Sequence, residues 1–333
     1  MTRSRIYSSA TPVFVVPLFW SILSIFLTAC IADESTPMQV VDAMPQVQSD
    51  AQVPDPVELV IATFNVKQFF DTVCDSSRCT AQSFEMVPTA SEFEAKARQL
   101  AQGIQSLNAD VLLLQEIESD ACLTALRDNL GDTYQASVLG ETNGSASLDV
   151  AVISRFPIAE VVSHRDRAIP LIGQQGNTYF TRDFLEVHLE VEGASVVVFN
   201  AHFRSKYPPD DPAQRLAEAS AAQEIVSNEA RDNPDALVVL GGDLNDVPGS
   251  APINAIEAGR YLTRVATELG VDAATYIYRG EGQAIDHLYL AEEAAGQYLS
   301  GTAQVVRNNP RGLAGSDHGA LVGTFSVTPL SSQ

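Results

Sequence analysis

The sequence predicts an α/β (α+β) protein in which one β-sheet packs on another and helices flank the pair. Short apolar, β-branched segments recur along the chain, and two of them, 184–191 and 194–201, are expected to pair antiparallel around the Glu192–Gly193 turn. Amphipathic helices are expected between other strands, at 91–107 and 212–230. The sequence lacks the Gly-rich dinucleotide fingerprint and the phosphate-binding P-loop, which argues against a doubly wound fold.

The other elements follow from the same periodicity. Ser91 stands in the position of an N-cap for the first helix. Residues 111–116 follow that helix as an apolar strand that ends in a carboxylate, a succession typical of layered α/β packing. Further strands are expected at 58–65, 148–154, 237–242, 285–290 and 320–327.

The first residues have the pattern of an export signal. Arg3 and Arg5 form a positive region, and an apolar run follows from Pro12 to Leu27. The end of this run, Leu-Thr-Ala-Cys at 27–30, resembles the lipobox of bacterial lipoproteins. We therefore expect a lipoprotein-type signal peptide at 1–29 and a lipid on Cys30 that attaches the exported chain to the bacterial membrane and cell envelope. A plain signal peptide, giving a periplasmic or secreted protein, and an uncleaved anchor helix are the alternatives.

Composition divides the rest of the chain. Residues 30–57 are rich in Pro, Gln, Asp and Ser without apolar periodicity, which predicts a disordered acidic tether. No comparable linker interrupts 58–328, so one domain is expected there, followed by a short tail at 329–333. We expect the protein to be a monomer.

The charge balance is strongly acidic. Asp and Glu number 42 against 20 Lys and Arg, for a net charge of −22. Loss of the signal peptide would remove the two positive charges of Arg3 and Arg5 and leave −24. Such a surface repels polyanions at long range, which counts against tight, non-specific binding of long nucleic acid.

Cysteine usage fits export. Apart from Cys30, the chain has Cys74, Cys79 and Cys122, an odd number. In an oxidising compartment two of them are expected to pair, and a Cys74–Cys79 disulfide would close a short surface loop. The sequence leaves the pairing open, with a metal knuckle at 74–79 as the weaker alternative.

Polar residues with catalytic chemistry stand at the strand ends. Apolar strands gain nothing in packing when one after another ends in Asp, Glu, Asn or His. The number of such strand ends therefore indicates a functional site. Oxygen ligands without clusters of Cys or His suit a hard cation such as Mg²⁺, with Mn²⁺ or Ca²⁺ as substitutes, and such a cation supports phosphoester hydrolysis. These residues are Asn65, Glu116, His202, Asp243, Asn245, Asp286, Asp317 and His318.

Six motifs contain these residues: FNV, LLLQE, NAHFRSK, GGDLND, IDHLYL and SDHGAL. In this order and spacing they resemble the endonuclease/exonuclease/phosphatase superfamily, which is deoxyribonuclease I-like. The resemblance spans about residues 60–325. It implies a four-layered sandwich of two mixed β-sheets flanked by helices, with a Mg²⁺-dependent phosphoesterase site at one end.

The resemblance also implies roles for the residues that would bind metal and water. Glu116 would ligate the metal directly, with Asn65 beside it orienting metal and phosphate. Asp317 would be a ligand of a second metal site or a support for the first. Asp243 and Asn245 would position and activate the attacking water, and Asn245 would also touch the phosphate.

Two histidines complete the implied catalytic set. His318 would act on the phosphate or the nucleophile, with Asp286 orienting its imidazole. His202 takes the place of a histidine that contacts phosphate or leaving group in deoxyribonuclease-like members. The motifs leave open which of Asp243, His202 and His318 is the general base.

Three cationic side chains are weaker candidates for phosphate binding. Arg155, Arg182 and Lys206 could each assist there, with a solvated surface charge as the alternative account.

We expect an exported nuclease that hydrolyses phosphodiester bonds of nucleic acid. The alternatives are a phosphomonoesterase or phospholipase-type enzyme acting on small phosphorylated compounds or lipid headgroups, and a catalytically inactive surface binding protein.

Overall fold

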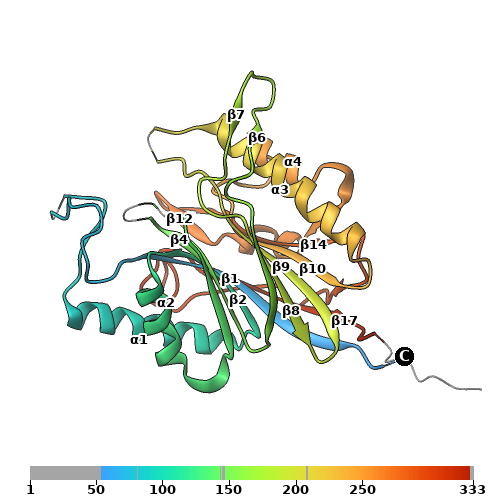
Figure 1. Cartoon of the computed structure of the whole chain (residues 1–333), viewed down its shortest axis with the longest axis horizontal. Coiled ribbons are helices and arrows are strands. Elements are labelled where there is room, and N and C mark those ends of the chain that lie inside the picture. Colours follow the sequence, from blue (N-terminus) through green and yellow to red (C-terminus); the bar gives the residue numbers. More distant parts are fainter. Residues whose placement is uncertain (1–53, 81, 143, 145–146, 208, 331–333) are drawn as a thin grey trace, which may run out of the picture. The chain divides into compact units, whose positions relative to one another are not determined.

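The computed structural model describes residues 54–330, apart from 81, 143, 145–146 and 208. Two β-sheets pack face to face, with α1 (Ala90–Leu107) and α2 (Asp120–Leu130) on one side and α3 (Pro212–Asp232) and α4 (Ala251–Ile256) on the other (Figure 1). The predicted four-layered sandwich of two mixed sheets is therefore confirmed.

The first sheet has, within the described residues, the strand order β15-β17-β1-β2-β4-β3, with β16 also paired to β17. Its central pair, β1 and β2, is parallel, and its other pairs are antiparallel. Its strands are β1 (Val57–Phe69), β2 (Val111–Ile117), β3 (Ala136–Gly140), β4 (Asp149–Ser154), β15 (Gln297–Tyr298), β16 (Gln304–Val306) and β17 (Ala320–Val327).

The second sheet repeats this plan, with the order β11-β14-β10-β9-β8-β5 among the described residues. Its parallel pair is β9 and β10, and β8 and β9 form the predicted antiparallel hairpin. Its strands are β5 (Ile158–Ser163), β8 (Leu185–Val191), β9 (Ala194–His202), β10 (Leu237–Asp243), β11 (Leu262–Arg264) and β14 (Asp286–Ala291).

Short elements connect these layers. Two small hairpins stand apart from the main sheets, and three 3₁₀ turns lie in connections of the described chain. They are β6 (Ile169–Pro170) with β7 (Asn177–Thr178), β12 (Tyr276–Tyr278) with β13 (Glu281–Gln283), and the turns Gly131–Thr133, Ala258–Arg260 and Val265–Ala273.

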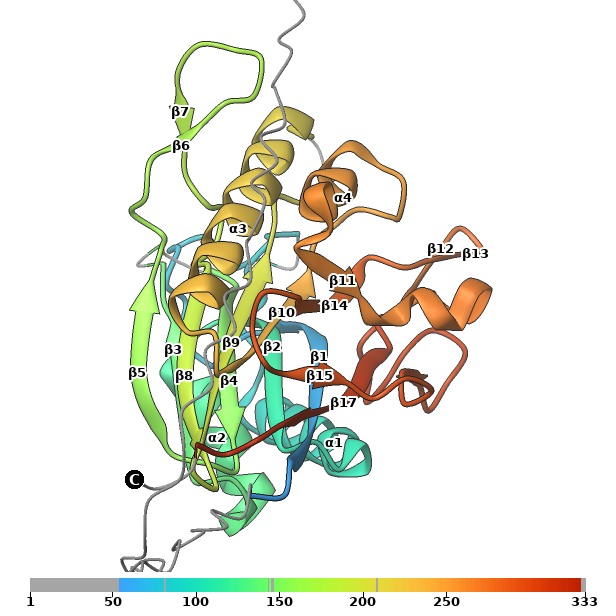
Figure 2. The same cartoon turned by 90° about the vertical axis from the view of Figure 1, so that its right-hand side faces the viewer.

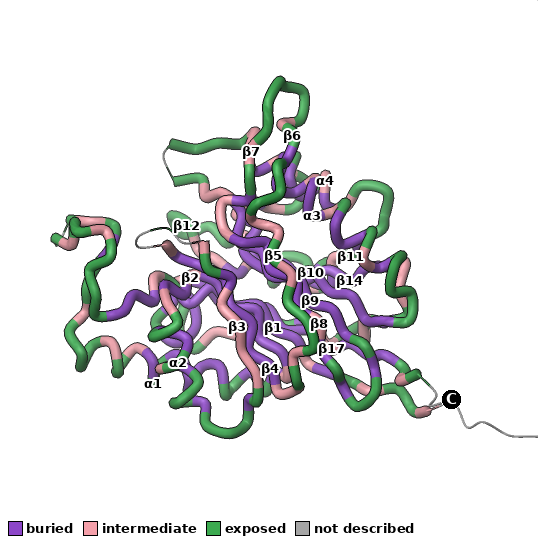
Figure 3. Tube along the Cα trace, viewed as in Figure 1, coloured by how far each residue is buried: buried purple, intermediate pink, exposed green. Residues whose placement is uncertain are grey.

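Apolar side chains fill three layers. The middle layer lies between the sheets and takes alternate residues of β1, β2 and β4 on one side and of β8, β9 and β10 on the other. The opposite faces of these strands pack on α1 and α2 in one outer layer and on α3 and α4 in the other. Figure 2 shows α3 lying along the second sheet. In Figure 3 buried residues follow the two sheets, whereas the segment 71–88 is mostly exposed.

The start of α1 corrects one prediction. Thr89, not Ser91, is the N-cap: its side chain accepts from the backbone N–H of Glu92, whose carboxylate accepts from the backbone N–H of Thr89. The helix therefore begins at Ala90.

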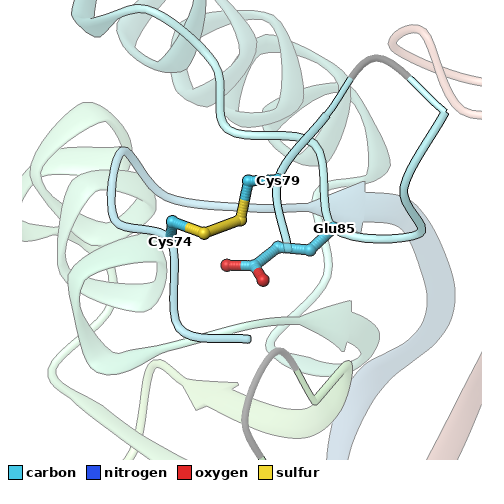
Figure 4. A group of neighbouring side chains, drawn as sticks. All are labelled: Cys74, Cys79 and Glu85. Atoms are coloured by element: carbon cyan, nitrogen blue, oxygen red, sulfur yellow. A yellow bond between two sulfur atoms is a disulfide. The ribbon is translucent and has the colours of Figure 1, made fainter. Parts of the chain in front are cut away.

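A disulfide joins Cys74 and Cys79 in the connection after β1, and Cys122 is a buried free thiol. Glu85 lies against this disulfide (Figure 4), and its carboxylate accepts hydrogen bonds from the backbone N–H groups of Asp75 and Ser76. Because both sulfurs are oxidised, they are not thiolate ligands, and the weaker metal-knuckle alternative is not what this loop forms.

The expected signal peptide at 1–29, the lipid on Cys30 and the tether up to residue 53 lie outside the described residues. β1 begins at Val57, and β17 ends at Val327, close to the expected domain bounds of 58 and 328. Across the part of the chain that the structure describes, no helix combines the length and apolar character needed to span a membrane.

Candidate active site

The site lies where the parallel strand pairs of both sheets end. On the second sheet, His202, Asp243 and Asp286 occupy one row across β9, β10 and β14. On the first sheet, Asn65 pairs with Gln115, the residue before Glu116. Strand ends of the two sheets therefore bring residues far apart in sequence to one place.

Asn65 links the two sheets. Its side-chain Nδ2 lies 3.2 Å from Oε1 of Glu116 and 3.0 Å from Oδ2 of Asp243, and donates to both carboxylates. Its Oδ1 accepts from the backbone N–H of Lys67 at 2.9 Å. Because Asn65 is buried, these bonds fix the relative positions of the two carboxylates.

Glu116 points into the site because β2 is bulged at this residue. The pairing of β2 with both neighbours shifts between Gln115 and Ile117, and Glu116 has a φ of 67°. The left-handed backbone is unfavourable for a non-glycine residue, and such strain is concentrated at functional sites. Its Oε2 accepts from the backbone N–H of Gln68 at 2.7 Å.

Asp243 depends on the glycine before it. Gly242 has a φ of 146°, and a Cβ there would lie 1.9 Å from the carbonyl oxygen of Ala201. β10 can therefore approach β9 closely only with glycine at this position. Asn245 is held in turn: its backbone N–H donates to Oδ1 of Asp243 at 2.9 Å and its Nδ2 donates to the carbonyl of Phe203 at 3.1 Å.

The environment of Asp243 favours its protonated form more than water does. Burial raises the pKa of Asp243, and the nearby Asp286 raises it further, to about 7, against the opposing effects of His318 and the hydrogen bonds from Asn245 and Asn65. A carboxylate with a pKa near neutrality can accept a proton during turnover.

His318 and Asp286 form a buried pair. Nδ1 of His318 lies 2.8 Å from Oδ2 of Asp286. Burial alone would lower the pKa of His318, but Asp286, Asp243 and Asp317 outweigh burial and raise it to about 10. The surrounding carboxylates therefore favour the imidazolium form of His318, the contact with Asp286 fixes its orientation, and Tyr276 packs beside its ring with centroids 4.9 Å apart.

His202 has the opposite electrostatics. Burial, and then the positive charges of Arg182 and His318, push its pKa well below the ordinary value, so the imidazole is neutral. Its Nε2 lies 3.8 Å from Oδ2 of Asp243. Its Nδ1 is buried and has no hydrogen-bond partner among the described residues.

Asp317 lies at the rim of the site. Its Oδ2 is 2.7 Å from Nζ of Lys67, and both side chains are partly exposed. Lys96 donates to the backbone carbonyls of Lys67 and Gln68, which holds the bulged end of β1 in place. The candidate second metal ligand is thus ion-paired with a lysine in this structure.

Comparisons with known proteins identify the family. The model of the endonuclease/exonuclease/phosphatase family matches residues 62–318. The chain belongs to this family. The predicted membership is therefore confirmed, and the family consists of phosphoester-hydrolysing enzymes. A comparison with curated protein sequences finds no match.

Solved structures share the fold at low sequence identity. An endonuclease/exonuclease/phosphatase from Bacteroides vulgatus is 14% identical, with 81% of this chain and 99% of that chain covered and a TM-score of 0.57. The human Nocturnin catalytic domain is 16% identical (83% and 98% covered, TM-score 0.57). TDP2 from D. rerio, complexed with a single-strand DNA product, is 17% identical (80% and 98% covered, TM-score 0.52). At these identities the likeness shows the fold alone.

Three cationic side chains were predicted to assist phosphate binding, and for Arg155 this prediction is wrong. It follows β4, which runs antiparallel to β2, so it stands beside Asp110 at the opposite end of β2 from Glu116. The six residue steps from 110 to 116 correspond to about 20 Å of strand. Arg155 binds Asp110 at 2.8 Å and also Asn108, and is not a phosphate-binding residue of this site.

Arg182 and Lys206 lie on the active-site side. Arg182 is half-buried and donates to the carbonyl of Phe203; burial lowers its pKa, while Glu116, Glu218 and Asp243 oppose this effect. Lys206 is bound to Asp246 at 2.7 Å. Arg182 is therefore the cation that faces the carboxylates of the site.

Several supporting residues were not singled out from the sequence. Beneath the site, Gln115 donates to Oδ1 of Asn200 at 2.7 Å, and Asn200 donates to the carbonyls of Leu114 and Ala151, which ties the two sheets together. Glu218 is fully buried and accepts hydrogen bonds from the backbone N–H groups of Thr181 and Arg204. Gln115 and Asn200 belong to the LLLQE and NAHFRSK motifs, and this position in the motifs could have marked them as residues near the site.

A divalent cation fits this arrangement. Glu116 offers a carboxylate from the first sheet, which Asn65 holds in place through its Nδ2, and Oδ1 of Asp286 is buried without a partner among the described residues. A carboxylate oxygen of Asp243 and one of Asp286 also lie within 4.8 Å of each other. Oxygen donors of this kind suit a hard cation, and the family's chemistry is consistent with one.

Proposed function

We propose that this protein is a Mg²⁺-dependent nuclease that hydrolyses phosphodiester bonds of nucleic acid, with Mn²⁺ or Ca²⁺ as possible substitutes. The observation that carries the proposal is the convergence of Glu116 and Asn65 from one sheet on Asp243 and the Asp286–His318 pair of the other. It would combine a metal ligand, a proton acceptor and a cation within one largely buried group.

In the proposed reaction, a water oxygen forms a bond to phosphorus while the bond from phosphorus to the leaving oxygen breaks. Asp243 accepts the proton of the water, and Asn245, fixed by Phe203, orients that water. Glu116, with Asn65 beside it, would hold the metal, which when bound would stabilise negative charge at the phosphate oxygens. His318, as an imidazolium held by Asp286, donates a hydrogen bond to a phosphate oxygen.

His202 and Arg182 complete the proposed phosphate site. His202 is neutral and buried, so it can donate a hydrogen bond to phosphate without adding a charge. Arg182 supplies the positive charge on the same side. Asp317, which lies at the rim and is ion-paired with Lys67, would be the ligand of a second metal site.

The acidic charge supports one alternative. A net charge of −22 disfavours a long polyanion and favours a small phosphorylated compound or a lipid headgroup, which would make the enzyme a phosphomonoesterase or phospholipase-type hydrolase. In favour of the nuclease, the fold is shared with a TDP2 structure that holds a single-strand DNA product.

A substrate panel tests the choice. Linear and supercoiled DNA, RNA, sugar phosphates and sphingomyelin are each incubated with the wild type and with Asp243→Ala, in Mg²⁺ and in EDTA. We expect cleavage of nucleic acid that needs Mg²⁺ and Asp243. Turnover of only the small or lipid substrates would select the alternative, and full activity in EDTA would rule out the proposed metal site.

We further propose export with a lipid on Cys30. The positive, apolar and Leu-Thr-Ala-Cys segments at 3–30 support it, and a disulfide at Cys74–Cys79 suits an oxidising compartment. Palmitate labelling of the wild type and its loss in Cys30→Ser is the expected result. A soluble, unlabelled wild-type product would contradict it.

A further inference from the structure

A second polar cluster lies on the outer face of the second sheet, away from the active site. On β8, Leu185, Val187 and Leu189 point into the middle layer, so Glu186 and His188 point to the opposite face. Glu229 reaches this cluster from the C-terminal part of α3, and His164 reaches it from the chain just after β5.

Both imidazoles contact one carboxylate. Nε2 of His164 lies 2.7 Å from Oε2 of Glu186, and Nε2 of His188 lies 2.7 Å from Oε1 of the same side chain. Oε1 of Glu229 is 3.9 Å from Nε2 of His188. One ligand atom from each of Glu186, His188 and Glu229 therefore lies within 4.8 Å of the other two.

The cluster is shielded from water. The side chains of Glu186 and Glu229 are 7% and 14% exposed, and that of His188 is 20% exposed. Phe184 and Phe199 pack against the ring of His164. In such surroundings charges need close partners of opposite sign.

Carboxylates gather around His188. Glu186 and Glu229 each place an oxygen near Nε2 of this residue, at 2.7 Å and 3.9 Å. Glu160, on the neighbouring strand opposite His188, adds a third carboxylate nearby. A divalent cation would neutralise the two central carboxylates.

We propose that this cluster is a Zn²⁺ site, with His188, Glu186 and Glu229 as ligands. One imidazole nitrogen with carboxylate oxygens is a donor set that suits Zn²⁺ better than Mg²⁺ or Ca²⁺. His164 contacts the other oxygen of Glu186, and Asn233 donates to Oε1 of Glu229 at 2.6 Å. These two contacts orient the ligand carboxylates, as partners of metal ligands commonly do.

Binding releases a proton where Nε2 of His188 carries one. That nitrogen must be unprotonated to donate its electron pair to Zn²⁺, so affinity falls as the pH is lowered.

The site would fasten α3 to β8 and would not take part in catalysis. Glu229 is 11 residues from Glu218 on the same helix, or about 16 Å along its axis. Glu218 in turn holds the backbone of Thr181 and Arg204 next to the active site. Zn²⁺ is therefore expected to stabilise the folded chain without being needed for hydrolysis.

The test is a Zn²⁺ titration of the full chain after EDTA treatment and dialysis, in saturating Mg²⁺ and with a competing chromophoric chelator. One equivalent of Zn²⁺ should bind and raise the Tm, and Co²⁺ should give a visible absorption band. His188→Gln and Glu229→Gln should each weaken this binding by more than about 100-fold, because loss of a partner of a ligand alone costs about 10–100-fold.

Two matched variants separate this site from other accounts. Glu190→Gln removes an exposed carboxylate from the same face of β8 and should bind Zn²⁺ like the wild type. Glu116→Gln alters the proposed catalytic metal ligand and should still bind one equivalent of Zn²⁺. The proposal would be overturned if the wild type bound no Zn²⁺ or if Mg²⁺ displaced the bound Zn²⁺. It would also be overturned if both His188→Gln and Glu229→Gln still bound Zn²⁺ with an unchanged circular dichroism spectrum.

Discussion

Asp243 contacts active-site residues of both sheets, so its substitution is the sharpest test of the proposed site at the scale of single residues. Asp243→Asn keeps the shape of the side chain but removes the proton acceptor, and kcat should fall by about 10²–10⁴. The Tm should fall modestly, because Oδ1 of Asn can still accept from the backbone of Asn245 but its Nδ2 replaces the oxygen that accepts from Nδ2 of Asn65. Asp235→Asn, at an exposed position before β10, is the control and should retain full activity.

His287 supplies a pH-dependent part of the stability. It is buried, its Nε2 lies 2.9 Å from the carbonyl oxygen of Asp246, and burial lowers its pKa to about 4. In the unfolded chain it is protonated below about pH 6.5, so its stabilising contribution is present above that pH and is lost as the pH falls toward 4.

His287→Gln should therefore have a shallower dependence of unfolding free energy on pH between 6.5 and 4 than the wild type. The stability lost by the wild type over this range should exceed that lost by the variant by about 3 kcal/mol. Urea unfolding at several pH values measures it, and parallel curves for the two proteins would refute the assignment.

At the scale of elements, the start of α1 gives a local prediction. Thr89→Ala removes the side chain that accepts from Glu92 and should cost about 1 kcal/mol of stability. Ser91→Ala alters the residue that the sequence suggested as N-cap and should cost much less, because Ser91 lies inside the helix. Chemical denaturation compares the two, and equal losses would contradict the assigned cap.

The same helix shows why element boundaries are harder to predict than elements. Both Thr89 and Ser91 are good capping residues, and each is followed three positions later by a glutamate, Glu92 or Glu94, so the sequence offers a capping box at both positions. Long β-branched strands such as β10 were predictable because buried strands are uniformly apolar. The edge strands β3 and β5 were missed, since their partly exposed residues do not follow a clear alternation.

The sequence allowed the site residues to be predicted only where they follow a recognisable strand. Asp243 and Glu116 follow apolar runs, so the sequence marks them. The direction of each strand in the sheet is not visible in the sequence, so Arg155 was expected at the active-site edge although the end of β4 that carries it lies at the opposite edge. The Lys67–Asp317 ion pair joins residues 250 positions apart and depends on how β1 meets the chain before β17.

At the scale of the whole molecule, the charge of −22 predicts an unusual salt dependence. Proteins that bind DNA through many cations lose affinity as salt rises. Here the molecule as a whole repels a polyanion, so added salt screens repulsion, and kcat/KM on DNA should rise between about 20 and 150 mM NaCl at constant Mg²⁺. A small monoanionic phosphodiester should show a much weaker dependence. A steep fall of kcat/KM on DNA with salt would instead indicate that a local basic surface around Arg182 dominates binding.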